Sequence, residues 1–179
     1  MIKYLEATEI VDYNNKEVHA LALKTNRNYD EMVKNFPDIK EELCQCTNGS
    51  IMVMMSRYNE NPLVCLACNN FISPEGIDID VTTTAKLQQW RAIYDSIDRL
   101  WLESGAYETW AVQELSNPKS SLHKQGFEVQ TMMQNYGKCY YWWFQDISKD
   151  EPLKNCPKCH KELEKNRTNL VCEKCLLVM

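Results

Sequence analysis

Two short stretches near the end of the chain decide how its last segment folds: Cys156-Pro157-Lys158-Cys159 and, twelve residues later, Cys172-Glu173-Lys174-Cys175. A Cys-x2-Cys turn places both sulfur atoms on one side and directs backbone N–H groups at them, which favours the thiolate form. Two such turns supply the four ligands of a tetrahedral Zn²⁺ site. The residues between them fit a β-hairpin with Asn166-Arg167 near its tip. Residues 151–179 are therefore predicted to form a zinc ribbon.

Metal is expected to drive the folding of this ribbon, because so short a segment cannot bury enough apolar surface alone. Four reduced structural cysteines are the alternative, which the paired spacing disfavours. His160 could replace a sulfur ligand, but four correctly spaced cysteines make it an exposed neighbour. The apolar end Leu176–Met179 is expected to pack the ribbon onto the preceding residues, with a free tail that recruits a partner as the alternative.

Four further cysteines lie upstream, as Cys44-x-Cys46 and Cys65-x2-Cys68. The first pair would reach a metal through an extended chain, because a single residue separates its cysteines. The apolar run Ile51–Met55 predicts a strand that brings the two pairs together at one end of a sheet. We predict a second zinc site with four cysteine ligands here, with buried cysteines acting as small hydrophobic side chains as the alternative. Cys139, the ninth cysteine, is expected to be buried in that way.

The rest of the sequence predicts an α+β fold, with a strand-rich N-terminal part that holds the embedded zinc site, a middle helical segment and the C-terminal ribbon. We place the α+β body at residues 1–150. Strands are predicted at Glu17–Lys24, Ser50–Arg57 and Ile77–Val81, and a short helix at Asn28–Asn35. Leu87, Trp90, Tyr94, Ile97 and Trp101 recur at helical spacing and predict a helix of about four turns that ends near Gly105. Further helices are predicted at Tyr107–Leu115 and Ser121–Tyr136.

An aromatic run follows the helices and predicts a strand, Cys139–Phe144. In a strand, Tyr140, Trp142 and Phe144 would share one face, and Tyr141 and Trp143 the other. One face should seal the core, and the other should meet the ribbon, a partner or solvent. The stripe with Trp90, Tyr94 and Trp101 is expected to be core and not a base-stacking platform.

The charge of the chain argues against a large nucleic-acid-binding face. The formal net charge is -5 at pH 7, and each Zn²⁺ bound by four thiolates leaves a further charge of about -2. Residues 1–80 carry 13 acidic and 7 basic side chains, whereas residues 151–179 carry 4 and 6. The ribbon is therefore close to neutral once metal is bound, while duplex binding normally needs several uncompensated lysines or arginines.

The apolar runs of the chain, such as Ile51–Met55 and Tyr140–Phe144, are short and fall far below a membrane span. Residues Met1–Val11 contain no signal-peptide core. We therefore expect a cytoplasmic protein, in which reduced cysteines bind metal instead of forming disulfides.

Catalytic motifs are not found in the sequence. His19 and His123 have no nucleophile at a recognisable spacing, and the five glycines are too scattered for a phosphate-binding loop. Asp78 and Asp80 could bind a hard cation from one strand face, but a solvated face is the simpler interpretation. Metal sites closed by four protein ligands leave no open position for chemistry. We expect no enzyme, although a site assembled only in three dimensions would escape this reasoning.

An ordered series of motifs over residues 43–179 resembles a bacterial family of unknown function, described as containing a zinc ribbon and as a candidate for nucleic-acid binding. Beyond the cysteine pairs, the series is Asn61-Pro62-Leu63, Trp90-x3-Tyr94-x3-Asp98-Arg99-Leu100, Ser104-Gly105, Leu115-Ser116-Asn117-Pro118, Gln125-Gly126, Tyr140-Tyr141 and Leu177. The chain departs from the family pattern at His160, where glycine is expected, and at Leu176, where a basic residue is expected. Both departures remove features that would help a ribbon approach a phosphate backbone.

Two functions remain open from the sequence. The first is a zinc-binding adaptor whose ribbon contacts nucleic acid, or a complex that handles it, through Lys154, Lys158, Lys161, Lys165, Arg167 and Lys174. A solvated face is the alternative for these side chains. The second is a protein-binding module, such as an inhibitor or immunity-type protein, that turns its acidic surface in residues 1–80 towards a basic partner. No membrane partner is expected, and the sequence does not give the oligomeric state.

Overall fold

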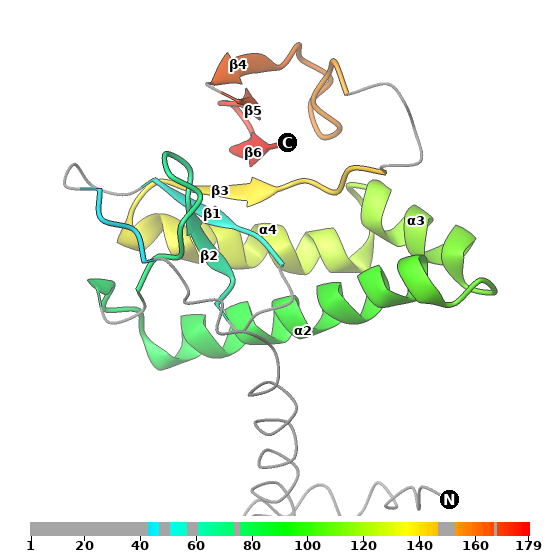
Figure 1. Ribbon diagram of the computed structural model, residues 1–179, viewed down its shortest axis with the longest axis horizontal. Helices are drawn as coiled ribbons and strands as arrows, with labels where there is room; N and C mark the ends of the chain where they lie inside the picture. The colour runs from blue at the N-terminus through cyan, green and yellow to red at the C-terminus, as the bar shows by residue number, and fades with distance from the viewer. Residues whose placement is uncertain (1–42, 47–50, 57–60, 74–75, 147–152, 167) are drawn as a thin grey trace, which may run out of the picture. The chain divides into compact units, whose positions relative to one another are not determined.

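Helices and one mixed sheet make up the part of the chain that the computed structural model describes, residues 43–46, 51–56, 61–73, 76–146, 153–166 and 168–179 (Figure 1). All of these residues belong to one unit of the chain, Glu42–Met179. The predicted strand Glu17–Lys24 and helix Asn28–Asn35 lie outside the described residues. The described elements give the α+β class that the sequence predicts.

The sheet has six strands in the order β2-β1-β3-β6-β5-β4. Their bounds are β1 Met52–Met54, β2 Leu63–Cys65, β3 Cys139–Trp142, β4 Glu164–Asn166, β5 Asn169–Cys172 and β6 Leu177–Val178. β3 is parallel to both of its neighbours, and the other pairs are antiparallel. The N–H groups of Tyr141 and Trp143 donate to the carbonyls of Leu176 and Val178, both at 2.8 Å. The ribbon hairpin β4–β5 is therefore part of the same sheet as β1–β3, joined to it through β6.

Side chains alternate across the sheet and form two buried clusters. Met52, Met54 and Tyr141 belong to the larger cluster, which also contains the buried residues of the helices. Val53 and Tyr140, one position along, belong to a smaller cluster on the other face. The predicted alternation holds from Tyr140 to Trp143 and fails at Phe144, which joins the larger cluster because regular pairing ends at Trp142.

Helix α2, Val81–Glu103, buries the predicted stripe of Leu87, Trp90, Tyr94 and Ile97. The expected strand Ile77–Val81 is wrong, because the Asp80 carboxylate caps this helix and accepts from the N–H groups of Thr82 and Thr83, at 2.8 and 3.0 Å. Val81 is accordingly 86% exposed. Aspartate is among the most favoured N-cap residues, and its hydrogen bonds to the first N–H groups of the helix override a short alternating pattern. The helix is therefore longer than the sequence suggested.

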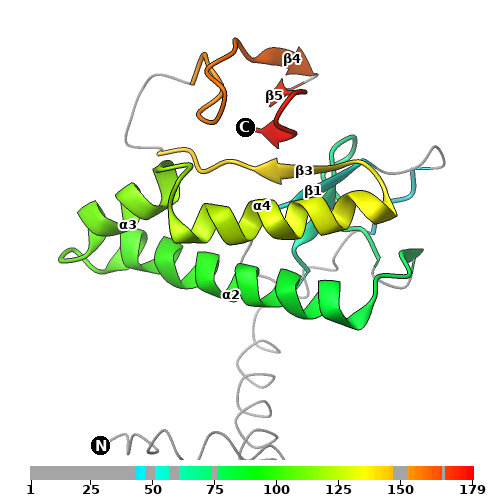
Figure 2. The same cartoon turned by 180° about the vertical axis from the view of Figure 1, so that it is seen from behind.

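The two remaining helices, α3 Glu108–Ser116 and α4 Ser121–Met133, lie with α2 on one side of β3 (Figure 1, Figure 2). A short 3-10 helix, η2 Gln134–Tyr136, extends α4. Gly105, with a φ of 60°, allows the turn between α2 and α3. Ser120 caps α4 by accepting from the His123 N–H. These bounds agree with the predicted helices to within a few residues.

Close packing between α4 and the sheet depends on Gly126. A Cβ atom at this position would lie 2.4 Å from Cε2 of Tyr141 and 2.8 Å from Nε1 of Trp90. No side chain fits there without moving the buried aromatic residues. The Gln125-Gly126 motif therefore has a packing function.

A hydrogen-bonded chain of buried polar groups crosses the same core. The Trp90 Nε1–H donates to the Tyr141 hydroxyl, which lies 2.9 Å from Nδ1 of His123. Nε2 of His123 lies 2.7 Å from the carbonyl oxygen of Leu115. Burial lowers the pKa of His123 to about 4, so the ring is neutral, with its proton on Nε2 and Nδ1 accepting from Tyr141. Both ring nitrogens are thus used in holding α3, α4 and β3 together.

Candidate metal centres

The ribbon brings its four cysteines together as one cluster: the Sγ atoms of Cys156, Cys159, Cys172 and Cys175 all lie within 4.8 Å of one another. Sγ of Cys159 is 3.6 Å from Sγ of Cys172. A tetrahedral Zn²⁺ site with Zn–S bonds of about 2.3 Å requires sulfur–sulfur distances of about 3.8 Å. The cluster therefore fits a tetrahedral thiolate site with little movement.

The first turn of the ribbon has the local geometry that stabilises thiolates. The His160 N–H donates to the carbonyl of Cys156 at 2.9 Å, and the Lys161 N–H, directed at the Cys159 sulfur, lowers the pKa of that thiol to about 7. His160 itself is exposed, as expected, and stands outside the cluster. It has a φ of 60°, the left-handed conformation in which glycine is favoured. His160, where the family pattern has glycine, therefore holds a backbone conformation that is unfavourable for a residue with a Cβ atom.

The upstream cysteines also come together: the Sγ atoms of Cys44, Cys46, Cys65 and Cys68 lie within 4.8 Å of one another. Cys65 ends β2 and is buried, and its Sγ is 4.0 Å from that of Cys46. The Cys44 N–H donates to the carbonyl of Phe71 at 2.7 Å. The Cys-x-Cys pair is thus held in an extended chain against the residues that follow β2.

Three residues other than glycine have a positive φ in the described part of the chain, and all three directly follow a Cys-x2-Cys turn. They are Asn69 at 59°, His160 at 60° and Leu176 at 51°. The Asn69 N–H donates to the carbonyl of Cys65 at 2.8 Å, as His160 does to Cys156. Because the upstream turn has the same backbone geometry as the two ribbon turns, the same chemistry is expected of it. This likeness supports metal binding by the upstream cluster.

Without a cation, several thiols of these clusters resist ionisation, in contrast to Cys159. Hydrogen bonds from neighbouring thiols, first from Cys44, raise the pKa of Cys46 to about 12. Burial raises the pKa of Cys175 and of Cys172. A bound metal ion displaces these protons, so binding should release protons and weaken in acid. Cys139, by contrast, is fully buried away from both clusters, and burial raises its pKa to about 12.

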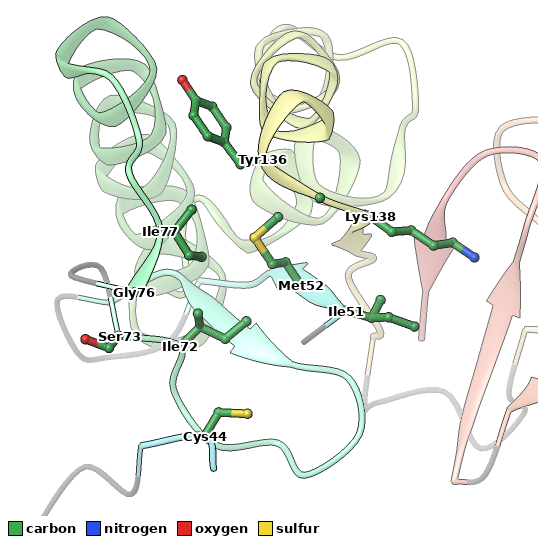
Figure 3. Close-up of a pocket in the computed structure, with 10 residues that line it drawn as sticks. Cys44, Ile51, Met52, Ile72, Ser73, Gly76, Ile77, Tyr136 and Lys138 are labelled. Carbon is green, nitrogen blue, oxygen red and sulfur yellow. The ribbon is translucent and has the colours of Figure 1, made fainter. Parts of the chain in front are cut away.

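A pocket of about 460 Å³ lies beside the upstream cluster (Figure 3). Cys44 lies at one end and Tyr136 at the other, while the Lys138 side chain extends away from the pocket. The Tyr136 hydroxyl donates to the Asp80 carboxylate at 2.5 Å, and the Lys138 ammonium pairs with Glu173 at 2.7 Å. The hydroxyl of Tyr136 and the ammonium of Lys138 are therefore engaged by carboxylates outside the pocket lining. Asp80 serves as a helix cap, and Asp78 is exposed.

Of the ribbon residues predicted to contact nucleic acid, five are described and exposed: Lys154, Lys158, Lys161, Lys165 and Lys174. Arg167 lies outside the described residues. The Lys158 ammonium lies 3.7 Å from the ring centroid of Phe127 on α4, so it faces the body. Glu162 and Glu164 are exposed on the same hairpin. These acidic neighbours reduce the positive charge available to a phosphate backbone.

The apolar end Leu176–Met179 packs the ribbon onto the body as predicted, but sequence reasoning missed the polar contacts that join the two. The Gln130 amide donates to the carbonyls of Leu176 and Cys139, at 2.6 and 3.2 Å. Glu173 in the second ribbon turn accepts from the Tyr140 hydroxyl at 2.5 Å and from Lys138. A glutamine within the apolar stripe of α4 is the signal that could have identified the first contact.

The fold and the two clusters define an α+β protein with two four-cysteine groups that can hold metal ions. The chain belongs to the family described as Domain of unknown function (DUF2310), which matches residues 46–145. Membership of a family of unknown function is what the series of motifs predicted. No curated protein and no solved structure matches the chain.

No helix among the described residues is both long and apolar enough to cross a membrane.

Proposed function

We propose that the protein is a zinc-folded adaptor without catalytic activity, in which each four-cysteine cluster holds a structural Zn²⁺. The observation that carries the proposal is the convergence of four thiols within 4.8 Å at two separate places. A tetrahedral all-sulfur donor set selects Zn²⁺ or an iron–sulfur centre. Four protein ligands leave no coordination position for a substrate.

The proposed absence of catalysis is supported by the surroundings of the titratable groups. His123 is buried with both ring nitrogens engaged, and Cys139 is a buried neutral thiol. Neither group reaches solvent, so neither can act on a substrate from the surface.

Metal analysis tests the structural part of this proposal. The purified chain should contain two zinc ions, and Cys46→Ser and Cys172→Ser should each contain one. A content of one zinc ion per parent chain would show that the upstream cluster does not bind zinc. Visible absorbance from iron bound at either cluster would contradict zinc.

We assign nucleic-acid contact to the exposed ribbon lysines Lys154, Lys161, Lys165 and Lys174, with Lys158 and Arg167 as flanking groups. Exposure of these side chains supports the assignment, while Glu162, Glu164 and the negative metal–thiolate centre limit its strength. Binding should therefore be weak and strongly dependent on salt.

Fluorescence anisotropy with labelled single- and double-stranded oligonucleotides, at about 50 and 200 mM salt, tests this contact. Lys161→Glu combined with Lys165→Glu should abolish the low-salt binding. Lys86→Glu combined with Lys119→Glu, on the exposed surfaces of α2 and the α3–α4 turn, makes the same charge change outside the ribbon and should retain most of it. Equal loss in both variants, or no binding at low salt, would contradict the assignment.

A further inference from the structure

A groove of about 450 Å³ opens between the C-terminal half of α2 and the chain that follows β3. Four aromatic side chains line it, namely Tyr94, Trp101, Trp142 and Phe144, together with Ser56, Asp98, Leu102 and Gln145. Trp101 and Phe144 pack edge to face, with ring centroids 4.9 Å apart. Trp101 and Trp142 are partly exposed, and Leu102 is 43% exposed. The volume falls within the range of about 300–1,000 Å³ that is typical of binding sites.

Asp98 is the charged group of this groove. It is partly buried, and no residue that the structure describes forms a hydrogen bond or ion pair with it. Its neighbour Asp95, by contrast, accepts from the Ser56 hydroxyl and lies 3.7 Å from Arg91. Burial, and then the charge of Asp95, raises the pKa of Asp98. A carboxylate in an aromatic wall without a cation is unfavourable, and carboxylates in such places are normally paired.

The end of α2 adds to the negative potential at the groove. The helix has no basic residue in its last turn, so nothing in that turn offsets the partial negative charge of its C-terminal carbonyl groups. Leu102, in that turn, lines the groove, and Glu103 beside it is exposed. A cation in the groove would therefore meet the carboxylate, the helix end and several aromatic faces together.

We propose that this groove binds an arginine side chain presented by a basic protein partner. Arginine fits better than lysine, because a guanidinium group stacks on aromatic rings, is weakly hydrated and matches a carboxylate with two parallel hydrogen bonds. The site is separate from the ribbon, and its occupancy depends on neither nucleic-acid contact nor the identity of the metal. It goes beyond the adaptor function by naming the chemistry of a second partner.

Titration of the zinc-loaded protein with short peptides, monitored by NMR, tests the proposal. One peptide carries two arginines among glycines and serines, and its matched forms carry lysine or the uncharged analogue citrulline. The five tryptophans give five indole N–H signals, assigned with Trp101→Phe and Trp142→Phe. The arginine peptide should shift the signals of Trp101 and Trp142, and the citrulline peptide should bind at least tenfold more weakly.

Two matched carboxylate variants give the control. Asp98→Asn should weaken binding of the arginine peptide at least tenfold. Asp78→Asn makes the same change on an exposed carboxylate about 25 Å away, beyond the other end of α2, and should bind as the parent does. Because no described residue pairs with Asp98, Asp98→Asn should melt no lower than the parent chain. Trp142→Leu, on the groove wall, should weaken binding independently.

Three results would overturn the proposal. One is equal binding of the arginine peptide by the Asp98→Asn and Asp78→Asn variants. Another is equal affinity for the arginine, lysine and citrulline peptides. The third is binding of free arginine amide as tight as that of the peptide, because this would indicate a small-molecule site and not a protein-docking site.

Discussion

The two cysteine clusters have the same ligand set but are built by different means. The ribbon cluster joins two Cys-x2-Cys turns, each with backbone N–H groups directed at its sulfurs. The upstream cluster joins one such turn to an extended Cys-x-Cys pair, which is held by the contact of Cys44 with Phe71. The geometry of the ribbon cluster depends on local sequence, and that of the upstream cluster depends on the neighbouring strands. We therefore expect the two clusters to respond differently to the same perturbation.

The largest difference is expected from removing one ligand at each cluster. Cys172→Ser should lower the free energy of unfolding by more than about 3 kcal/mol, because the proposed zinc ion would stabilise the folded ribbon and the ribbon strand β6 pairs with β3. Cys68→Ser should lower it less, because β1 and β2 remain packed in the main core. Urea unfolding with parallel zinc analysis measures both. Equal losses in the two variants would show that the clusters contribute alike.

Protonation of the buried His123 in acid should destabilise the core. Its pKa falls from 6.5 in the unfolded chain to about 4 in the fold, so the unfolded chain binds more protons over this range. Stability is therefore full above pH 6.5 and is lost as the pH falls towards 4, by up to about 3 kcal/mol.

Urea unfolding of the parent and of His123→Asn, between pH 7 and 4, separates this effect from metal release, which both proteins share. The parent should be the more stable at pH 7, and the two curves should converge as the pH approaches 4. Parallel curves would contradict the assignment to His123.

A smaller effect, confined to the ribbon, is expected at Gln130. Gln130→Leu removes the donor to the Leu176 carbonyl, which keeps its bond from the Tyr141 N–H. The loss should be about 1–2 kcal/mol, and amide exchange should quicken in the ribbon but not around Cys65. Gln134→Leu is the control, because Gln134 contacts the Cys139 carbonyl without reaching Leu176. Faster exchange around both clusters would show that they are coupled.

The smallest effect is expected from the left-handed residues after the turns. His160→Gly should raise stability by about 1 kcal/mol, because glycine adopts a φ of 60° without a Cβ clash. Asn69→Gly should gain less, because asparagine tolerates this conformation better than most residues. Thermal melts of the two variants measure the difference. A larger gain at Asn69 would mean that the upstream turn is the more strained.

The sequence predicted the elements with strong periodicity or spacing. The stripe from Leu87 to Ile97 gave α2, and the spacing of Cys156 to Cys175 gave the ribbon hairpin. Both depend on contacts between residues close in the chain. Capping at Asp80 was missed because the alternation of Ile77 and Ile79 pointed to a strand, and a hydrogen-bonding cap outweighs so short a pattern.

Contacts between residues far apart in the chain could not be predicted from the sequence, for a physical reason. Pairing of β6 with β3, the Gln130 contact and the groove around Asp98 all join residues far apart in the chain. No local pattern fixes such distances. Gly126 is an intermediate case, because a glycine inside a helix suggests a close approach without naming Tyr141 as the neighbour.

The position of β6 within the sheet has a consequence for the order of synthesis. β6 lies between β3 and β5, yet Leu177–Val178 is made after every other described strand. A nascent chain can form its helices and the β1–β2–β3 portion early, but β3 keeps an open edge until β6 has left the ribosome. During that interval the unpaired edge of Tyr140-Tyr141-Trp142 is open to association with other chains. Chaperone binding and the supply of zinc during translation should therefore affect the yield of folded protein.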